Sequence, residues 1–124
     1  MTDATQASAQ SYAHDPRNDS VEVYVNGTFF AREKAMVPVF DSGFVLGDGV
    51  WEGMRLVKGK LLAADEHMAR LYEGANSIQL DIGMERGALI GEIWKTLHHN
   101  NMEDGVHIRM MISRGLKSTP NQDP

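Results

Sequence analysis

The stretch FDSGFVLGDGVWEGMR, residues 40–55, carries four glycines within eleven positions and then passes into an alternating pattern. It has neither of the spacings found in nucleotide-binding glycine loops, G-x-G-x-x-G and G-x-x-x-x-G-K-[ST]. Those loops open a helix, whereas the alternation over 50–57 predicts a strand. The glycines are therefore predicted to form a tight turn that enters a strand, because glycine tolerates sharp turns and close backbone approach.

The predicted strand has one apolar face that includes an acid and one face of mixed character. The first face holds Val50, Glu52, Met54 and Leu56, and the second holds Trp51, Gly53, Arg55 and Val57. Asp48 and Glu52 are candidates for an acid pair, or for hydrogen-bond partners within a hairpin. The sequence alone leaves both interpretations open.

Outward from this stretch the periodicity predicts a hairpin over 21–32, with Asn26-Gly27 as its two-residue turn. Apolar residues at helical spacing predict helices over 64–80, with Asp65 as N-cap, and over 85–99. A period of two returns over 105–115 and predicts a further strand. Strands and helices that are segregated along the chain indicate an α+β fold with an antiparallel sheet and two helices, rather than a doubly wound sheet.

Composition restricts the function classes. The chain has 124 residues, a net charge of −5 and no cysteine. The acidic balance argues against a nucleic-acid partner, and no apolar run approaches the roughly 18 residues of a membrane helix. The lack of cysteine excludes disulfides and thiolate metal sites, and it is consistent with a cytoplasmic location. The polar residues 1–20 are predicted to form a flexible tail.

Two arginines are candidate ligand-binding residues. Arg109 lies on the predicted strand 105–115, on the same side as His107, where a guanidinium can grip a carboxylate. A solvated face or an ion pair explains the same placement. Arg70 lies off the apolar stripe of its predicted helix, and periodicity alone leaves it in solvent. No spacing of histidines and acids predicts a metal site, and the pair His98-His99 suits a helix C-terminus.

Four segments in order resemble the class IV transaminases, the fold-type IV pyridoxal-phosphate enzymes. They are VYVNG (23–27), DSGFVLGDGVWEGMR (41–55), EHMARLYEGA (66–75) and HIRMMISRG (107–115). The family includes branched-chain aminotransferases, D-amino acid transaminases, R-selective amine transaminases and aminodeoxychorismate lyases. The resemblance covers the chain from about residue 21 to its end.

The resemblance implies roles for individual residues. Arg70 matches the family arginine that binds the phosphate of pyridoxal 5'-phosphate. Arg109 matches an arginine that receives a substrate carboxylate, with His107 in place of a tyrosine beside it. Trp51 stands where the family has Tyr or Phe and would form an aromatic wall of the substrate pocket without a tyrosine hydroxyl.

The resemblance also implies a domain organisation. Residues 21–115 would form the N-terminal α+β domain, and 116–124 would begin the interdomain loop. None of the lysines in the chain matches the family's catalytic Schiff-base lysine, so this residue is expected in a C-terminal domain or a second chain. The family also implies a homodimer that acts on an amino acid and a 2-oxo acid.

The expected activity is a transamination, with a branched-chain-like substrate favoured by the H-I-R strand. A D-amino acid or R-amine transaminase is the alternative, followed by an aminodeoxychorismate lyase-like β-elimination. A different class of function is a stand-alone binding or assembly domain that pairs with a partner chain. That interpretation follows if no lysine-bearing domain accompanies this chain.

Overall fold

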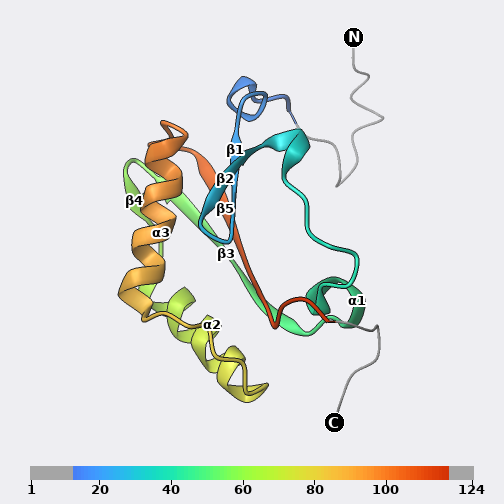
Figure 1. The fold of residues 1–124 in the computed structure, drawn as a ribbon. Coiled ribbons are helices and arrows are strands. Elements are labelled where there is room, and N and C mark those ends of the chain that lie inside the picture. Colours follow the sequence, from blue (N-terminus) through green and yellow to red (C-terminus); the bar gives the residue numbers. More distant parts are fainter. Residues whose placement is uncertain (1–12, 118–124) are drawn as a thin grey trace, which may run out of the picture. The chain divides into compact units, whose positions relative to one another are not determined.

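A computed structural model describes residues 13–117 of the chain. These residues divide into two compact units, with the boundary after Ala35 (Figure 1). Each unit is described separately below. Among the described residues, no helix combines the length and the apolar character that crossing a membrane requires. The predicted tail 1–20 lies largely outside the described residues, as does most of the segment 116–124.

The first unit is built around the predicted hairpin. Strand β1 (Glu22–Val25) pairs antiparallel with β2 (Thr28–Ala31), so that Val25 faces Thr28 across a two-residue turn. Asn26 and Gly27 both have positive φ, 51° and 88°, which is the conformation that such a turn requires. Short 3-10 turns at Pro16–Asn18 and Arg32–Lys34 flank the hairpin. The predicted hairpin and its turn residues are confirmed.

The second unit contains a three-stranded antiparallel sheet in the order β4-β3-β5. The long central strand β3 (Gly49–Val57) pairs with β5 (Val106–Ser113) from Gly49 to Leu56 and with the two-residue β4 (Lys60–Leu61) at its end. Lys58 and Gly59 form the tight turn between β3 and β4, both with positive φ. The predicted strand after the glycine stretch is therefore confirmed.

Three helices accompany this sheet, α1 (Ser42–Leu46), α2 (Ala64–Ser77) and α3 (Arg86–His99). Helix α1 was not predicted, since five residues are too few for a helical period to emerge. Helix α2 ends three residues earlier than predicted. Asp65 is not its N-cap: Ala63 occupies that position in a left-handed conformation, and Asp65 lies in the first turn. The charge of Asp65 still suits a helix N-terminus.

The core of the second unit lies between β3, α2 and α3. Met54 and Leu56 on β3 are almost fully buried, and so are Met68 and Leu71 on α2. Helix α3 contributes Leu89, Ile93 and Leu97. These residues are the apolar positions that the two periodicities had placed on one face of each element. The α+β class is confirmed, with the strands divided between two antiparallel sheets.

The close pairing of β3 and β5 leads to a prediction about stability. A Cβ atom at Gly49 would lie 2.6 Å from the carbonyl oxygen of Ile112, so the two strands would have to separate. We expect Gly49→Ala to lower the free energy of unfolding by about 2 kcal/mol, as overpacked sites do. Gly91→Ala is the matched control, because that helical glycine meets nothing within 4 Å. There we expect a gain of up to about 1 kcal/mol. Urea unfolding of both variants checks the prediction, and losses of equal size would contradict it.

Candidate anion-binding residues on the two faces of strand β3

A carboxylate lies buried on the inner face of β3, among apolar neighbours. Glu52 is 6% exposed and alternates with the buried Met54 and Leu56. An unpaired charge in such a place would be costly. Helix α2 supplies its partners, His67 and Arg70, which lie three residues apart and hence on the same side of the helix.

The contacts of Glu52 are short and use both of its oxygens. Arg70 Nε donates to Oε1 at 2.5 Å, and Arg70 Nη2 donates to Oε2 at 2.8 Å. His67 Nδ1 lies 2.7 Å from Oε2. Because an ionised carboxylate only accepts hydrogen bonds, Nδ1 is the ring nitrogen that carries the hydrogen in this contact. The hydrogen bond from Arg70 lowers the pKa of Glu52 to about 2, against the opposing effect of burial and with a smaller contribution from His67. Glu52 is therefore ionised at neutral pH.

Arg70 is anchored at one edge and open at the other. Its side chain is 69% exposed although the carboxylate that it binds is only 7% exposed. Among the described residues, Nη1 of Arg70 has no hydrogen-bond partner. A fixed and solvent-facing guanidinium edge of this kind fits a phosphate group, since a guanidinium presents parallel donors to anions.

The three predicted substrate residues come together on the outer face of the sheet. The guanidinium of Arg109 lies 4.3 Å from the ring centroid of Trp51, in a cation–π contact. Gly53 stands opposite Arg109 in the strand register. His107 Nε2 would lie only 3.1 Å from a Cβ atom at Gly53, so its ring lies close to this glycine. The structure thus brings Trp51, His107 and Arg109 together around a residue without a side chain.

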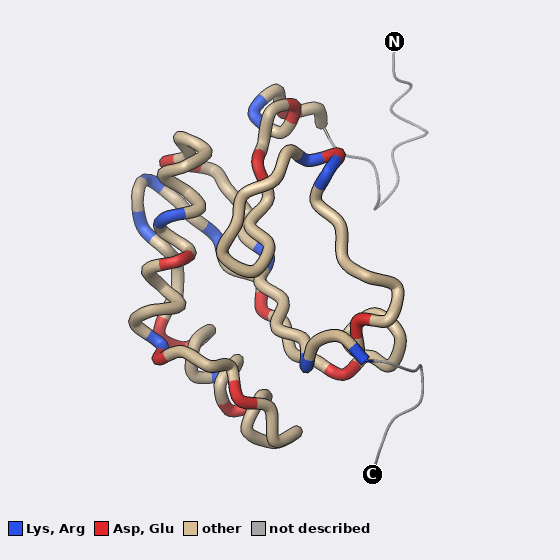
Figure 2. Tube along the Cα trace, in the orientation of Figure 1, with Lys and Arg blue, Asp and Glu red and all other residues tan. Residues whose placement is uncertain are grey.

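The outer face is cationic. Acidic and basic positions are interspersed along the described residues (Figure 2). The positions of β3 and β5 that form the outer face nevertheless hold no acid: they are Gly49, Trp51, Gly53, Arg55 and Val57 of β3 and His107, Arg109, Met111 and Ser113 of β5. Trp51 is 57% exposed and Met111 is 68% exposed. A carboxylate ligand would therefore meet positive charge and an aromatic surface on this face.

Asp48 and Glu52 do not form an acid pair, because each has its own arginine. Asp48 accepts from Arg114 Nε at 2.7 Å, and this contact lowers its pKa. The other nitrogens of Arg114 donate to the carbonyl oxygens of Ile78 and Gln79. Arg114 thus ties the start of β3 to the end of α2, where a cation is favourable.

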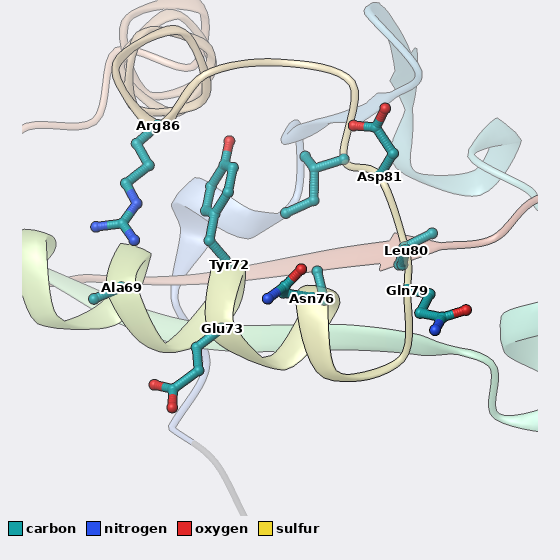
Figure 3. A pocket seen from close by; sticks show the side chains of 10 residues that line it. Ala69, Tyr72, Glu73, Asn76, Gln79, Leu80, Asp81 and Arg86 are labelled. Atoms are coloured by element: carbon teal, nitrogen blue, oxygen red, sulfur yellow. The ribbon is translucent and has the colours of Figure 1, made fainter.

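A hollow of about 860 Å³ lies beside the end of α2 and the segment that leads to α3 (Figure 3). Tyr72 and Arg86 lie side by side in it, with the guanidinium 5.5 Å from the ring centroid. The Tyr72 hydroxyl donates to the carbonyl oxygen of Met84 at 2.6 Å. None of the predicted site residues lines this hollow, and its acids, Glu73 and Asp81, do not favour an anion. The candidate anion-binding residues lie at β3 instead.

Comparison with known proteins identifies the family. The pattern of the amino-transferase class IV family matches residues 49–124, which is more than half of the chain and includes β3, α2 and β5. The chain belongs to the class IV aminotransferase family.

Relatives within and around this family come from several organisms. The chain is 38% identical over 109 residues to the branched-chain-amino-acid aminotransferase-like protein 1 of Arabidopsis thaliana, covering 88% of this chain and 20% of that protein. It is 37% identical over 95 residues to the D-alanine aminotransferase of Staphylococcus haemolyticus, covering 77% of this chain and 33% of that protein. The chain thus spans only 20% and 33% of the lengths of these two relatives.

A solved aminotransferase structure has the same fold over most of the chain. The branched-chain aminotransferase of Thermoproteus uzoniensis, solved with norvaline, superposes with a TM-score of 0.69 at 27% sequence identity. The match covers 84% of this chain and 35% of that one. The α+β architecture described above is therefore that of a part of a class IV aminotransferase.

Sequence reasoning missed two of the residues that organise this region, Glu52 and His67. The sequence pairs Glu52 with Asp48, and no motif in it singles out His67. A signal was present, however, because Glu52 interrupts the apolar face of the strand and His67 and Arg70 share one side of a helix. Among the described residues, no group of histidines and acids could hold a metal ion.

The lowered pKa of Glu52 leads to a prediction about acid stability. Its pKa in the folded state, about 2, lies below the ordinary value of 4.5, so its ion pair stabilises the protein fully above about pH 4.5. That contribution is lost as the pH falls through about 2. We expect the difference in unfolding free energy between wild type and Glu52→Gln to shrink over this window in urea titrations. Glu66→Gln, an exposed change on α2, is the control. A difference that is constant down to about pH 2 would contradict the prediction.

Proposed function

We propose that the protein to which this chain contributes is a pyridoxal-phosphate-dependent aminotransferase that moves an amino group between an amino acid and a 2-oxo acid. One observation carries the proposal beyond family membership. An arginine lies against each face of strand β3 and can bind an anion there. Arg70 of α2 donates to Glu52 on the inner face, and Arg109 of β5 stacks on Trp51 on the outer face. A transaminase with a phosphorylated cofactor and carboxylate substrates needs two such sites.

In this scheme the residues of this chain bind and orient the cofactor phosphate and the substrate. Arg70 holds the cofactor phosphate with its free Nη1 edge. Arg109 receives a substrate carboxylate, Trp51 forms an aromatic wall of the pocket and His107 lies beside the carboxylate. The bound cofactor supplies electron withdrawal that makes the substrate Cα–H acidic. The lysine that moves this proton belongs to a part of the protein outside this chain, which acts here as the N-terminal domain, residues 21–115.

A branched-chain-like amino acid is the favoured substrate. The relatives support this choice, since they include a branched-chain-amino-acid aminotransferase-like protein and a branched-chain aminotransferase of known structure. The outer face supports it as well, because the exposed Trp51 and Met111 offer apolar surface beside Arg109. A D-amino acid substrate is the alternative, supported by the similarity to a D-alanine aminotransferase.

The setting of the enzyme is also part of the proposal. We place it in the cytoplasm, as a homodimer, with the C-terminal domain following the interdomain loop that begins at residue 116. The exposed apolar side chains on the outer face are suited to contact with the C-terminal domain or with a second subunit.

Two measurements on the full-length protein test the proposed function. Intact mass before and after borohydride reduction should reveal a pyridoxyl-phosphate adduct. Transfer of the amino group to 2-oxoglutarate should then be faster from L-leucine or L-valine than from D-alanine. Faster transfer from D-alanine would select the alternative substrate. A protein with neither an adduct nor transfer would instead be a binding or assembly module.

A further inference from the structure

We propose that Glu52 is a positioning residue for the cofactor phosphate: it clamps one edge of the Arg70 guanidinium and so directs the opposite edge toward the phosphate. The inference rests on the proposed function, because it assigns Arg70 to the phosphate. It adds a residue on a different element, strand β3, to a site that is otherwise carried by helix α2.

Glu52 is held rigidly by the strand and by its hydrogen bonds. Glu52 lies on the central strand of the sheet, where its backbone pairs with Met110 of β5, one of the eight paired positions that hold β3 in register. Its side chain is 7% exposed, and both of its oxygens accept from Arg70. His67 occupies Oε2 from a second direction at 2.7 Å. The carboxylate therefore has one orientation, and it transmits that orientation to Arg70 through two parallel hydrogen bonds.

The contact with Glu52 also reduces the conformational entropy of the Arg70 side chain before a ligand binds. An exposed arginine samples many rotamers, and ordering such a side chain when a ligand binds costs free energy. Arg70 is 69% exposed and yet is held at Nε and Nη2 before any phosphate arrives. Prior fixation lowers the cost of binding and sets the direction of approach. A phosphate would then bind at Nη1, which has no partner among the described residues.

The same contact fits the opposite role, in which Glu52 competes with the phosphate for Arg70. A carboxylate against Arg70 neutralises its charge and occupies donors that a phosphate could otherwise use. The burial of Glu52 favours the clamp, because a competitor must leave when the phosphate binds and Glu52 has no solvent to enter. Departure would also strand an ionised carboxylate in the core.

The test compares two ligands in the full-length protein, pyridoxal 5'-phosphate and pyridoxal, by absorbance or fluorescence titration. The ratio of their dissociation constants reports on the phosphate site alone, because misfolded protein lowers the apparent binding of both ligands alike. We expect Glu52→Gln to reduce this preference for the phosphorylated ligand about tenfold. Losses of that size are typical when a residue that orients a ligand-binding side chain is removed. Glu66→Gln, which removes an equal charge from the exposed side of α2, should leave the ratio unchanged.

Each outcome decides between the roles. A larger preference for the phosphorylated ligand in Glu52→Gln would identify Glu52 as a competitor and overturn the clamp. An unchanged ratio would overturn it as well, provided that Arg70→Ala lowers the ratio in the same assay. If Arg70→Ala also leaves the ratio unchanged, the assignment of Arg70 to the phosphate fails, and with it that part of the proposed function.

Discussion

Replacing Arg70 with alanine in the full-length protein is expected to weaken binding of pyridoxal 5'-phosphate about 100-fold, which corresponds to about 2.7 kcal/mol. Two terms add in this change. The phosphate loses a charge-assisted hydrogen-bond donor, an interaction worth about 1.5–3 kcal/mol. Glu52 in turn keeps its negative charge without the two Arg70 contacts that offset it, and this uncompensated charge repels the phosphate.

Pyridoxal is the control ligand for this prediction, because it lacks the phosphate. Its dissociation constant should change by less than about threefold, since no other part of the ligand is assigned to Arg70. Arg70→Lys is the matched variant. It keeps the charge but cannot bind Glu52 through two parallel donors, so it should recover only part of the affinity. Equal weakening of both ligands would show that Arg70 supports the fold rather than the phosphate.

Reversing the charge at Arg109 is expected to raise the KM for 2-oxoglutarate about 100-fold. Arg109→Glu replaces an attraction for the distal carboxylate with a repulsion on a face that otherwise holds no acid. It also removes the cation that lies over Trp51. Steady-state kinetics with the dicarboxylate and with a branched-chain monocarboxylate acceptor should show the larger change for the dicarboxylate.

Arg55→Glu is the matched control for Arg109. Arg55 lies on the same outer face, directly across from His107 in the strand register, and undergoes the same change in charge. A general electrostatic effect would raise KM equally in both variants, whereas a specific carboxylate contact would affect Arg109 far more. An unchanged KM in Arg109→Glu would remove Arg109 from the substrate site.

Both predictions depend on the geometry of a single strand. Successive side chains of β3 point to opposite faces, so Trp51 lies on the outer face of the sheet and Glu52 on the inner face. A register shift by one residue would exchange them and bury Trp51 and Arg55 against α2. The eight paired positions between β3 and β5 hold this register.

The class of fold and the main elements followed from the sequence. Alternation is a local property of the chain, and so is the helical spacing of Met68, Leu71 and Ala75, which is why β3 and α2 could be predicted. The hairpin turn at Asn26-Gly27 is equally local, because few residues tolerate positive φ at both positions. Element ends were less predictable, since a left-handed residue such as Ala63 has no sequence signature.

The contacts that form the two candidate anion sites were decided only by the tertiary structure. Arg70 had no ligand role by periodicity, and only the resemblance to class IV transaminases suggested one. Its partner Glu52 lies 18 residues away along the chain, and their contact exists because α2 packs on the inner face of the sheet. In the same way, Trp51 and Arg109 meet because β3 and β5 pair antiparallel in one register. Contacts between distant segments depend on packing, and packing is not encoded in any one segment.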